Sequence, residues 1–376
     1  MLLERVKPES ILLILVTILV SIGIIMIYSS SAIYAEKYWN SHSRFILRHL
    51  VFLGFGLVLF RIAIRFSYEG YKKSIPLFLV VTFVLLILVL IPGIGKEVSG
   101  ARRWIRFFGV GFQPSELLKL SMLFWISGYL DRRKVQLSNF SRGLLPTFIV
   151  FGIYIFLLLL QPDFGTSVLL SLLLLLMTFV AGVKPLHIIG SILGLASVSF
   201  LLIISQAYRL RRISAFLDPW ADPFDSGFQL VQSFIAYGSG GLLGRGLGNS
   251  RQKLFFLPEA HTDFIFSIYA EETGFIGVSF MLFVLVLFLV TGLRISMSCR
   301  DDFGRNLSFG ITTLVTLQSL MHIGVVTGLL PTKGIPLPFI SYGGSSLLLN
   351  LFIVGILINI AKSNREHNPA QMKNYG

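Results

Sequence analysis

Residues 256–266 read FLPEAHTDFIF and deliver one carboxylate, Asp263, to the start of a long apolar stretch. Glu259 and His261 precede it at alternate positions. An ionisable side chain at a membrane boundary costs free energy, so it is a candidate for a function. Asp263 could act as a general base, or it could cap the helix that follows. Glu259 could support such a site and His261 could help to bind its ligand, or both could simply belong to the loop.

Two arginine-rich motifs lie near similar apolar boundaries. Residues 100–106 read GARRWIR, and residues 208–212 read YRLRR. Guanidinium groups form paired hydrogen bonds with phosphate oxygens, and tryptophan is common at the level of lipid headgroups. The motifs therefore predict either binding of a phosphate-bearing ligand or anchoring at the membrane interface. The candidate ligand-binding residues in them are Arg102, Arg103, Trp104, Arg209, Arg211 and Arg212.

Two shorter polar motifs add further candidates. In QPSELLK, Glu116 and Lys119 stand three residues apart on one helix face, which suits an ion pair or leaves Lys119 facing a ligand. In QPDFG, Asp163 is well placed to cap the helix that follows. Alternatively, Asp163 and Asp263 could hold a divalent cation, Mg²⁺ or Mn²⁺, beside a diphosphate.

A stretch rich in Gly and Pro, residues 331–346, precedes the last apolar segment. Non-helical backbone at membrane depth is tolerated where it packs in protein or lines a wet cavity. We therefore expect this stretch to form the rim of a cavity, with Ser341 as a supporting residue. Gly343 and Gly344 suit close packing of the helix that begins there.

The composition indicates what kind of protein carries these residues. Of 376 residues, 54% are hydrophobic and 13% are charged, and the mean hydropathy is +0.79. These values predict an all-α polytopic membrane protein. About ten apolar segments have the length that a bilayer requires. They are residues 11–33, 45–67, 74–93, 112–130, 143–161, 164–183, 186–205, 263–292, 307–330 and 340–361.

The distribution of Lys and Arg predicts the orientation. The short loops on the side of the two termini carry about twice as many of these residues as the short loops on the other side, so both termini are expected in the cytoplasm. The large loop between spans seven and eight, about residues 206–262, is then extracytoplasmic. Within it, residues 227–237 have the apolar spacing of a short interfacial helix. Residues 1–363 form one membrane domain, and residues 364–376 are expected to be a polar cytoplasmic tail.

The net charge of +14 does not indicate a nucleic-acid partner, because the basic residues are scattered over both faces of a membrane protein. Topology alone would favour fewer cations on the outer face. An anionic lipid headgroup or a phosphate-bearing ligand explains their number there better.

Several motifs, in the same order along the chain, are similar to those of a known family. GARRWI (100–105), QPSELLKL (113–120), QPDFGTS (161–167), LPEAHTDFIF (257–266), EETGFIG (271–277) and GIPLPFISYGGSS (334–346) resemble the SEDS family of bacterial envelope proteins, which includes RodA, FtsW and SpoVE. The likeness covers nearly the whole chain. Ala260 and the form of the GARRW motif resemble the division member FtsW more than the elongation member RodA.

The resemblance implies a peptidoglycan glycosyltransferase in the bacterial cytoplasmic membrane, at the division septum for an FtsW-like member. Its substrate would be lipid II, an undecaprenyl-diphosphate-linked disaccharide pentapeptide, polymerised at the outer face. The resemblance also implies a ten-span fold, Asp263 as the motif aspartate, and a class B penicillin-binding protein as the partner that crosslinks the new strand.

The chemistry of that reaction fits the residues found above. Displacement of a diphosphate by a sugar hydroxyl with inversion needs one base and positive charge on the leaving group. Asp263 is therefore the expected base. Arg102, Arg103 and Lys119 are expected to hold the diphosphate, and the arginines of residues 208–212 are expected to guide the headgroup.

Two other functions are compatible with the sequence. A flippase that moves lipid II across the membrane would also have many spans and intramembrane charges, but no internal repeat is visible, and the candidate site charges lie towards the outer face and not near the midplane. A non-catalytic scaffold for the transpeptidase would not need an aspartate and several cations at one membrane face.

Overall fold

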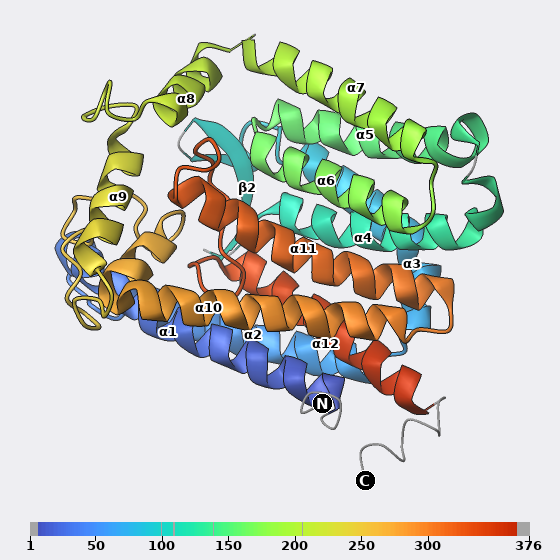
Figure 1. Ribbon diagram of the computed structural model, residues 1–376, viewed down its shortest axis with the longest axis horizontal. Coiled ribbons are helices and arrows are strands. Elements are labelled where there is room, and N and C mark those ends of the chain that lie inside the picture. Colours follow the sequence, from blue (N-terminus) through green and yellow to red (C-terminus); the bar gives the residue numbers. More distant parts are fainter. Residues whose placement is uncertain (1–6, 99, 108–109, 138, 205, 367–376) are drawn as a thin grey trace.

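The computed structural model of the protein describes residues 7–98, 100–107, 110–137, 139–204 and 206–366. Its long helices run side by side, parallel or antiparallel to one another (Figure 1). Within these ranges, one helix corresponds to each of the ten predicted spans. The helices are α1 (Pro8–Trp39), α2 (Arg44–Arg65), α3 (Tyr68–Leu88), α4 (Pro114–Arg132), α5 (Leu145–Leu160), α6 (Phe164–Val180), α7 (Pro185–Ile204), α10 (Ile265–Met297), α11 (Asp302–Val326) and α12 (Gly344–Glu366). A 3₁₀ turn (Lys134–Gln136) and a π-helical turn (Phe140–Leu144) connect α4 to α5.

The lengths and compositions of these helices confirm a polytopic helical membrane protein. Among the described residues, seven helical segments are long and apolar enough to cross a bilayer. The helices α6 and α7 are apolar but shorter. The 19-residue helix α4 is almost entirely buried, so it lies inside the bundle and contributes little to the lipid-facing surface.

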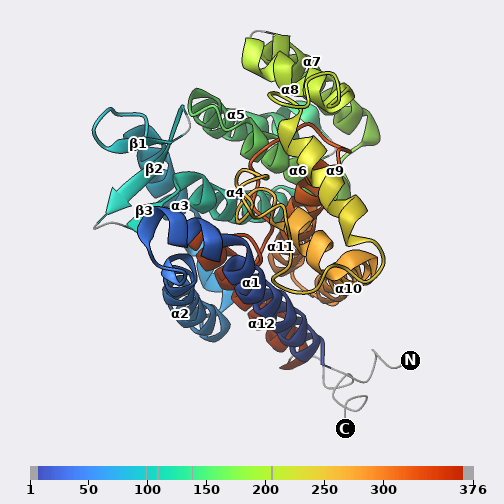
Figure 2. The same cartoon turned by 90° about the vertical axis from the view of Figure 1, so that its left-hand side faces the viewer.

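The centre of the bundle consists of α4, α11 and α12, whereas α7 lies at its edge (Figure 2). The helix α2 packs along α12, and small residues let the two backbones approach. A Cβ atom added at Gly355 would lie 2.7 Å from the Cβ of Ala63. At the start of α12, a Cβ at Gly344 would lie 2.5 Å from the ring of Phe52, whereas one at Gly343 would meet no atom closer than 3.7 Å.

Short strands and helices occupy one end of the bundle, which we call the loop end (Figure 1). The strands β1 (Gly95–Val98), β2 (Ala101–Phe107) and β3 (Val110–Phe112) form an antiparallel sheet in the order β1-β2-β3. The helices α8 (Ala207–Leu217) and α9 (Phe228–Gly240) lie in the large loop. The first turn of α1 and the last turn of α12 lie at the opposite end.

The sheet and α8 are additions to the architecture predicted from hydropathy. The motif GARRWIR folds as β2, in which the buried Ala101 and Ile105 alternate with more exposed side chains. The motif YRLRR lies on α8, a helix that the hydropathy pattern did not predict. The short helix predicted at residues 227–237 is confirmed as α9.

Two helix ends differ from the predicted boundaries for local reasons. The helix α11 begins five residues before the predicted span, because Asp301 Oδ2 accepts a hydrogen bond of 2.6 Å from the backbone N–H of Gly304 and caps the helix. The helix α12 extends through residues 364–366, so the predicted tail begins as helix. Residues 367–376 of that tail lie outside the described ranges.

Candidate active site at the loop end

Asp263 lies in a tight turn just before α10, within residues 254–264, which we call the Asp263 segment. The backbone N–H groups of Thr262, Asp263 and Phe264 all donate to the carbonyl oxygen of Glu259, over 3.1 to 3.2 Å. Glu259 itself adopts a φ of 54°, in the left-handed region. This turn presents the Asp263 side chain at the loop end. The motif LPEAHTDFIF thus determines the position of Asp263 through backbone hydrogen bonds to Glu259.

The Asp263 segment is bonded to the connection between α11 and α12, residues 327–343. Ser341 Oγ donates to the carbonyl oxygen of Thr262 at 2.7 Å, and the N–H of Tyr342 donates to the carbonyl oxygen of His261 at 3.0 Å. Gly334 of the same connection lies against the carboxylate, because a Cβ there would be 2.7 Å from Asp263 Oδ2. A side chain at this position would therefore displace Asp263. Sequence reasoning did not single out Gly334.

Buried polar side chains support this connection from inside the bundle. Gln318 Nε2 donates to the carbonyl oxygen of Pro336 at 2.8 Å, and His322 Nδ1 lies 2.7 Å from that of Ile335. Lys119 Nζ donates to Gln318 Oε1 at 3.0 Å and pairs with Glu116 Oε2 at 2.7 Å. Lys119 is only 2% exposed. Of the two readings of the Glu116 and Lys119 motif, the structure therefore shows the ion pair.

Cationic side chains reach this region from three different elements. Arg103 of β2 donates from Nε to the carbonyl oxygen of Gln161, at 3.0 Å, and from Nη2 to that of Pro162. Arg212 of α8 donates from Nη1 to the carbonyl oxygen of Thr332 at 3.2 Å.

The third cation is Lys333, from the α11–α12 connection. Its Nζ lies 4.4 Å from the ring centroid of Phe164, and Arg209 Cζ lies 5.5 Å from the same centroid. Lys333 was not among the predicted site residues. A lone lysine within a stretch rich in Gly and Pro was the available signal.

The charges of these groups influence one another. Burial and the nearby Glu259 raise the pKa of Asp263 to about 6, although Arg212 and Arg103 oppose the shift. Burial and Arg212 lower the pKa of Lys333 to about 8, which Asp163 opposes. At neutral pH most Asp263 is therefore ionised and most Lys333 is protonated. Within the described residues, the Asp263 carboxylate forms no hydrogen bond or ion pair.

Other predicted residues lie away from Asp263. Arg102 pairs with Glu97 of β1, with Nε 3.3 Å from Oε2. Successive residues of a strand point to opposite faces, so Arg102 and Trp104 share the face opposite to that of Arg103. The charge of Arg211 on α8 helps to lower the pKa of Asp222, whereas Arg212 and Arg103 are the cations that act on Asp263. Three of the predicted ligand-binding residues are therefore not brought together with the carboxylate.

His261 faces a cluster of aromatic rings from α1, α2 and the α11–α12 connection. Its ring centroid lies 4.7 Å from that of Phe45, 5.6 Å from that of Tyr34 and 5.9 Å from that of Tyr342. Burial lowers the pKa of His261, which Glu259 opposes. A neutral ring packed in this way helps to fix the position of the Asp263 segment.

Asp163 is a helix cap, and its surroundings do not form a protein-held metal site. Its Oδ1 accepts from the N–H of Thr166 at 3.2 Å, whereas its buried Oδ2 has no hydrogen-bond partner in the described part of the chain. Nowhere in that part do three or more His, Cys, Asp or Glu side chains gather as metal ligands. The side chains near Asp163 and Asp263 include three cations, which do not fit a resident divalent ion.

Comparison with known proteins identifies similar chains over nearly the full length. Residues 9–366 match the family model of FtsW, RodA and SpoVE, described as cell cycle protein. A probable peptidoglycan glycosyltransferase FtsW from Geobacter sp. (strain M18) is 44% identical, over 95% of this chain and 97% of the relative. Stage V sporulation protein E from Bacillus subtilis (strain 168) is 41% identical, over 96% and 99%.

Two solved structures share the fold. A chain from a study of structural coordination of polymerization and crosslinking by a peptidoglycan synthase complex has a TM-score of 0.76 and 30% identity, over 94% of this chain and 97% of that one. The rod shape determining protein RodA of Thermus thermophilus has a TM-score of 0.69 and 27% identity, over 94% and 96%.

Arg102 and Arg103 lie on opposite faces of β2, so replacing each with alanine should change the stability of the protein by a different amount. Arg103→Ala removes two charged hydrogen bonds to the end of α5 and should lower the free energy of unfolding by about 1.5–3 kcal/mol. The control, Arg102→Ala, removes a largely exposed ion pair and should change it by about 1 kcal/mol or less. Thermal unfolding of the purified variants in detergent measures both effects, and equal losses would contradict this placement.

Proposed function

The chain belongs to the cell cycle protein family of FtsW, RodA and SpoVE, and on this premise we propose that it is a peptidoglycan glycosyltransferase that polymerises lipid II. The observation that carries this proposal is an unpaired carboxylate, Asp263, among cations from three elements at one end of a membrane protein. A base and a cationic leaving-group site are what transfer of a sugar from a diphosphate requires.

The proposed reaction is a single inverting displacement. The 4-hydroxyl oxygen of the acceptor sugar forms a bond to C1 of the donor sugar, and the bond from C1 to the diphosphate oxygen breaks. The diphosphate leaves with the electron pair, and the Asp263 carboxylate takes the hydroxyl proton. A side chain in this role contributes about 10²–10⁴-fold to the rate.

Lys333, Arg212 and Arg103 are the proposed partners of the leaving diphosphate. Each of the two arginines uses one or two N–H groups on backbone carbonyls, and a guanidinium has five N–H donors in all. The remaining donors and the Lys333 ammonium are available for phosphate oxygens. Positive charge held in place before the reaction stabilises the charge that develops on the leaving group.

The presence of an apolar groove supports the proposal that the substrate is lipid-linked. It has a volume of about 480 Å³ and is lined by side chains of α5, α6 and α7 and by Leu317 of α11, and Phe164 of its lining lies near Arg209 and Lys333. A polyprenyl chain lying in this groove would place its diphosphate close to these cations. Burial of apolar surface would contribute about 25 cal/mol per Å² to binding.

The cellular setting is also proposed. The first turn of α1 and the last turn of α12 lie at the end of the bundle opposite the loop end. This arrangement supports a cytoplasmic location for both termini and an outer location for Asp263. Similarity to FtsW supports a place at the division septum. The similar solved chain from a peptidoglycan synthase complex supports a crosslinking partner, which we propose is a class B penicillin-binding protein.

Replacement of Asp263 tests the proposed activity directly. Asp263→Ala and the isosteric Asp263→Asn should fold and insert normally but lose at least about 10²-fold in polymerisation, because the base is absent. The assay uses purified protein in liposomes with lipid II in the accessible leaflet, and glycan polymer is measured. Full polymerisation by either variant would contradict a base role, whereas lipid movement without polymer from the unmodified protein would favour a flippase.

The pKa values predict a bell-shaped pH dependence of kcat/KM, which reports the free enzyme. Activity should fall below about pH 6 as Asp263 gains a proton and loses its capacity as a base. It should also fall above about pH 8 as Lys333 loses its positive charge. Lys333→Arg should remove the alkaline fall, because arginine stays protonated. An acidic midpoint near pH 4 would contradict the assignment to Asp263.

Filling the apolar groove should weaken substrate binding. Ser171→Trp places an indole among the groove residues and should raise KM by about 10-fold with a smaller change in kcat. The control is Leu77→Trp, at a side chain 64% exposed on α3, which should leave KM unchanged. The measurement is initial polymerisation rate against lipid II concentration. Equal KM values for the two variants would remove the groove from the substrate site.

A further inference from the structure

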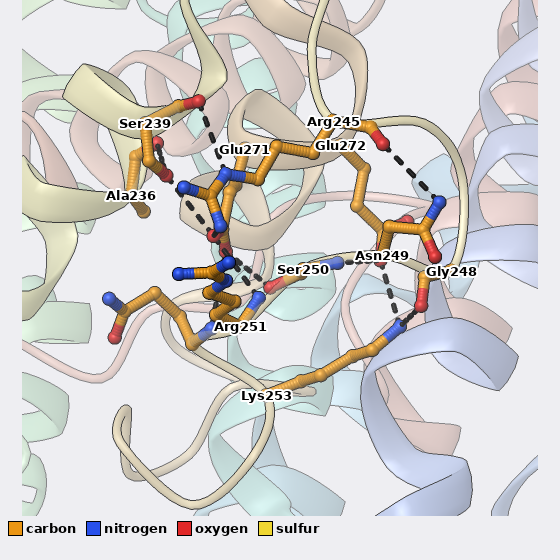
Figure 3. A network of polar contacts seen from close by, with 11 residues as sticks. Ala236, Ser239, Arg245, Gly248, Asn249, Ser250, Arg251, Lys253, Glu271 and Glu272 are labelled. Atoms are coloured by element: carbon orange, nitrogen blue, oxygen red, sulfur yellow. Dashed lines mark hydrogen bonds and ion pairs between the residues drawn. The ribbon is translucent and has the colours of Figure 1, made fainter.

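Two adjacent glutamates of α10, Glu271 and Glu272, are buried at the loop end, each 1% exposed (Figure 3). They belong to the motif EETGFIG, to which the proposed reaction assigns no role. Buried carboxylates are retained only where hydrogen bonds and opposite charges compensate their lost hydration. The partners of these two groups therefore show what they hold in place.

Glu271 binds the part of the large loop that leads to the Asp263 segment. Its carboxylate accepts hydrogen bonds from two hydroxyls and two backbone N–H groups of this loop and lies 3.8 Å from a guanidinium nitrogen of Arg245. The donors are Ser239 Oγ at 3.1 Å, Ser250 Oγ, Arg251 N at 3.1 Å and Gln252 N at 3.2 Å. Glu271 thus fixes the backbone of residues 250–252.

Glu272 joins the same loop to α1. Its Oε1 accepts from Ser29 Oγ of α1 at 2.6 Å and pairs with Lys253 Nζ at 3.0 Å. The N–H of Ser250 also lies within 3.4 Å of this oxygen. Three parts of the chain therefore meet at the two glutamates: α1, the large loop and α10.

The loop also replaces hydrogen bonds that α10 lacks. The helix is broken at Gly274, which has a φ of 66°. Around the break, the N–H of Arg245 donates to the carbonyl oxygen of Glu271 at 3.0 Å, and the N–H of Phe275 donates to that of Gly241 at 2.9 Å. The loop therefore satisfies backbone groups that the break in α10 leaves without helical partners, and it is hydrogen-bonded to α10 on both sides of the break.

These contacts close a ring in the chain that contains Asp263. The backbone leaves residues 251 and 252, passes through the Asp263 segment, enters α10 and returns at Glu271 to the same two residues. Ser341 and Tyr342 bind the part of the ring next to Asp263, at the carbonyl groups of Thr262 and His261. Glu271 closes this ring at residues 250–252, and the ion pair between Glu272 and Lys253 lies beside that closure.

We propose that Glu271 is a positioning residue for Asp263: by closing the ring at residues 250–252, it holds the Asp263 carboxylate against Gly334 and in the field of Arg103 and Arg212. Because this inference rests on the proposed function, it concerns the same reaction. Glu271 touches no reacting group. Its removal should loosen the ring without removing the base.

The test uses two variants of the full-length protein in the liposome polymerisation assay. Glu271→Gln keeps one acceptor oxygen and removes the charge, whereas Ser250→Ala removes one donor to Glu271 and leaves all charges in place. A misplaced catalytic group can cost about 100-fold, so kcat should fall by about 10- to 100-fold for Glu271→Gln and by less for Ser250→Ala. KM should stay within about twofold for both, because the cations and the groove are unchanged.

The pH profile distinguishes positioning from general support of the fold. A looser ring admits water to Asp263, so the acidic midpoint of kcat/KM should move below 6. The charged groups facing Asp263, namely Glu259, Arg212 and Arg103, are the same in both variants. A shift in Ser250→Ala involves no change of charge and therefore reports geometry. An unshifted midpoint in both variants, or unchanged kcat in both, would overturn the positioning role.

A matched control is the buried Glu9, which pairs with Arg365 at the opposite end of the bundle. Glu9→Gln changes the same chemical group far from Asp263 and should leave the acidic midpoint in place. If Glu9→Gln moves the midpoint as Glu271→Gln does, the positioning role is overturned. If the unmodified protein makes no polymer, the proposed function fails, and this outcome is distinct from failure of the Glu271 variants alone.

Discussion

The arrangement at the loop end depends on satisfying the non-helical backbone between α11 and α12. Backbone polar groups at membrane depth must form hydrogen bonds within the protein, because lipid offers none. Gln318 and His322 bind carbonyl groups of this connection from inside the bundle, and Arg212 binds another from α8. Ser341 and Tyr342 bind the connection to the Asp263 segment. The hydrogen bonds that satisfy the backbone of this connection therefore also fix the position of the Asp263 carboxylate.

The pairing of buried charges separates structural groups from reactive ones. Glu116 pairs with Lys119 beneath the connection, and Glu272 pairs with Lys253 where α1, the large loop and α10 meet. Removing one partner of such a pair leaves a buried charge without compensation, which typically costs 3–5 kcal/mol. Asp263 has no such partner among the described residues and has a raised pKa. A partly buried, unpaired carboxylate with a raised pKa, within a framework of paired charges, is typical of a functional site.

Hydropathy predicted the long helices because the length of an apolar stretch is tied directly to the thickness of a bilayer. It could not predict β2, because a seven-residue basic strand has no such constraint. Because the strand was not predicted, the sequence did not show that Arg102 and Arg103 point to opposite faces, and both were assigned to the diphosphate. Lys333 and Gly334 were missed for another reason: their importance arises only from tertiary contacts with Phe164 and Asp263.

One carboxylate is sufficient for the proposed chemistry, and the two other carboxylates of this region, those of Asp163 and Glu259, accept hydrogen bonds from neighbouring residues. Asp163 is committed to the N-terminus of α6, and the Glu259 carboxylate accepts the hydroxyl of Thr262 at 2.9 Å. A glycosidase needs a second carboxyl group to protonate a poor leaving group. A diphosphate leaves as an anion and needs cations in that place, which Lys333 and Arg212 supply. The charge distribution at the loop end therefore suits synthesis from a diphosphate donor better than hydrolysis of a glycosidic bond.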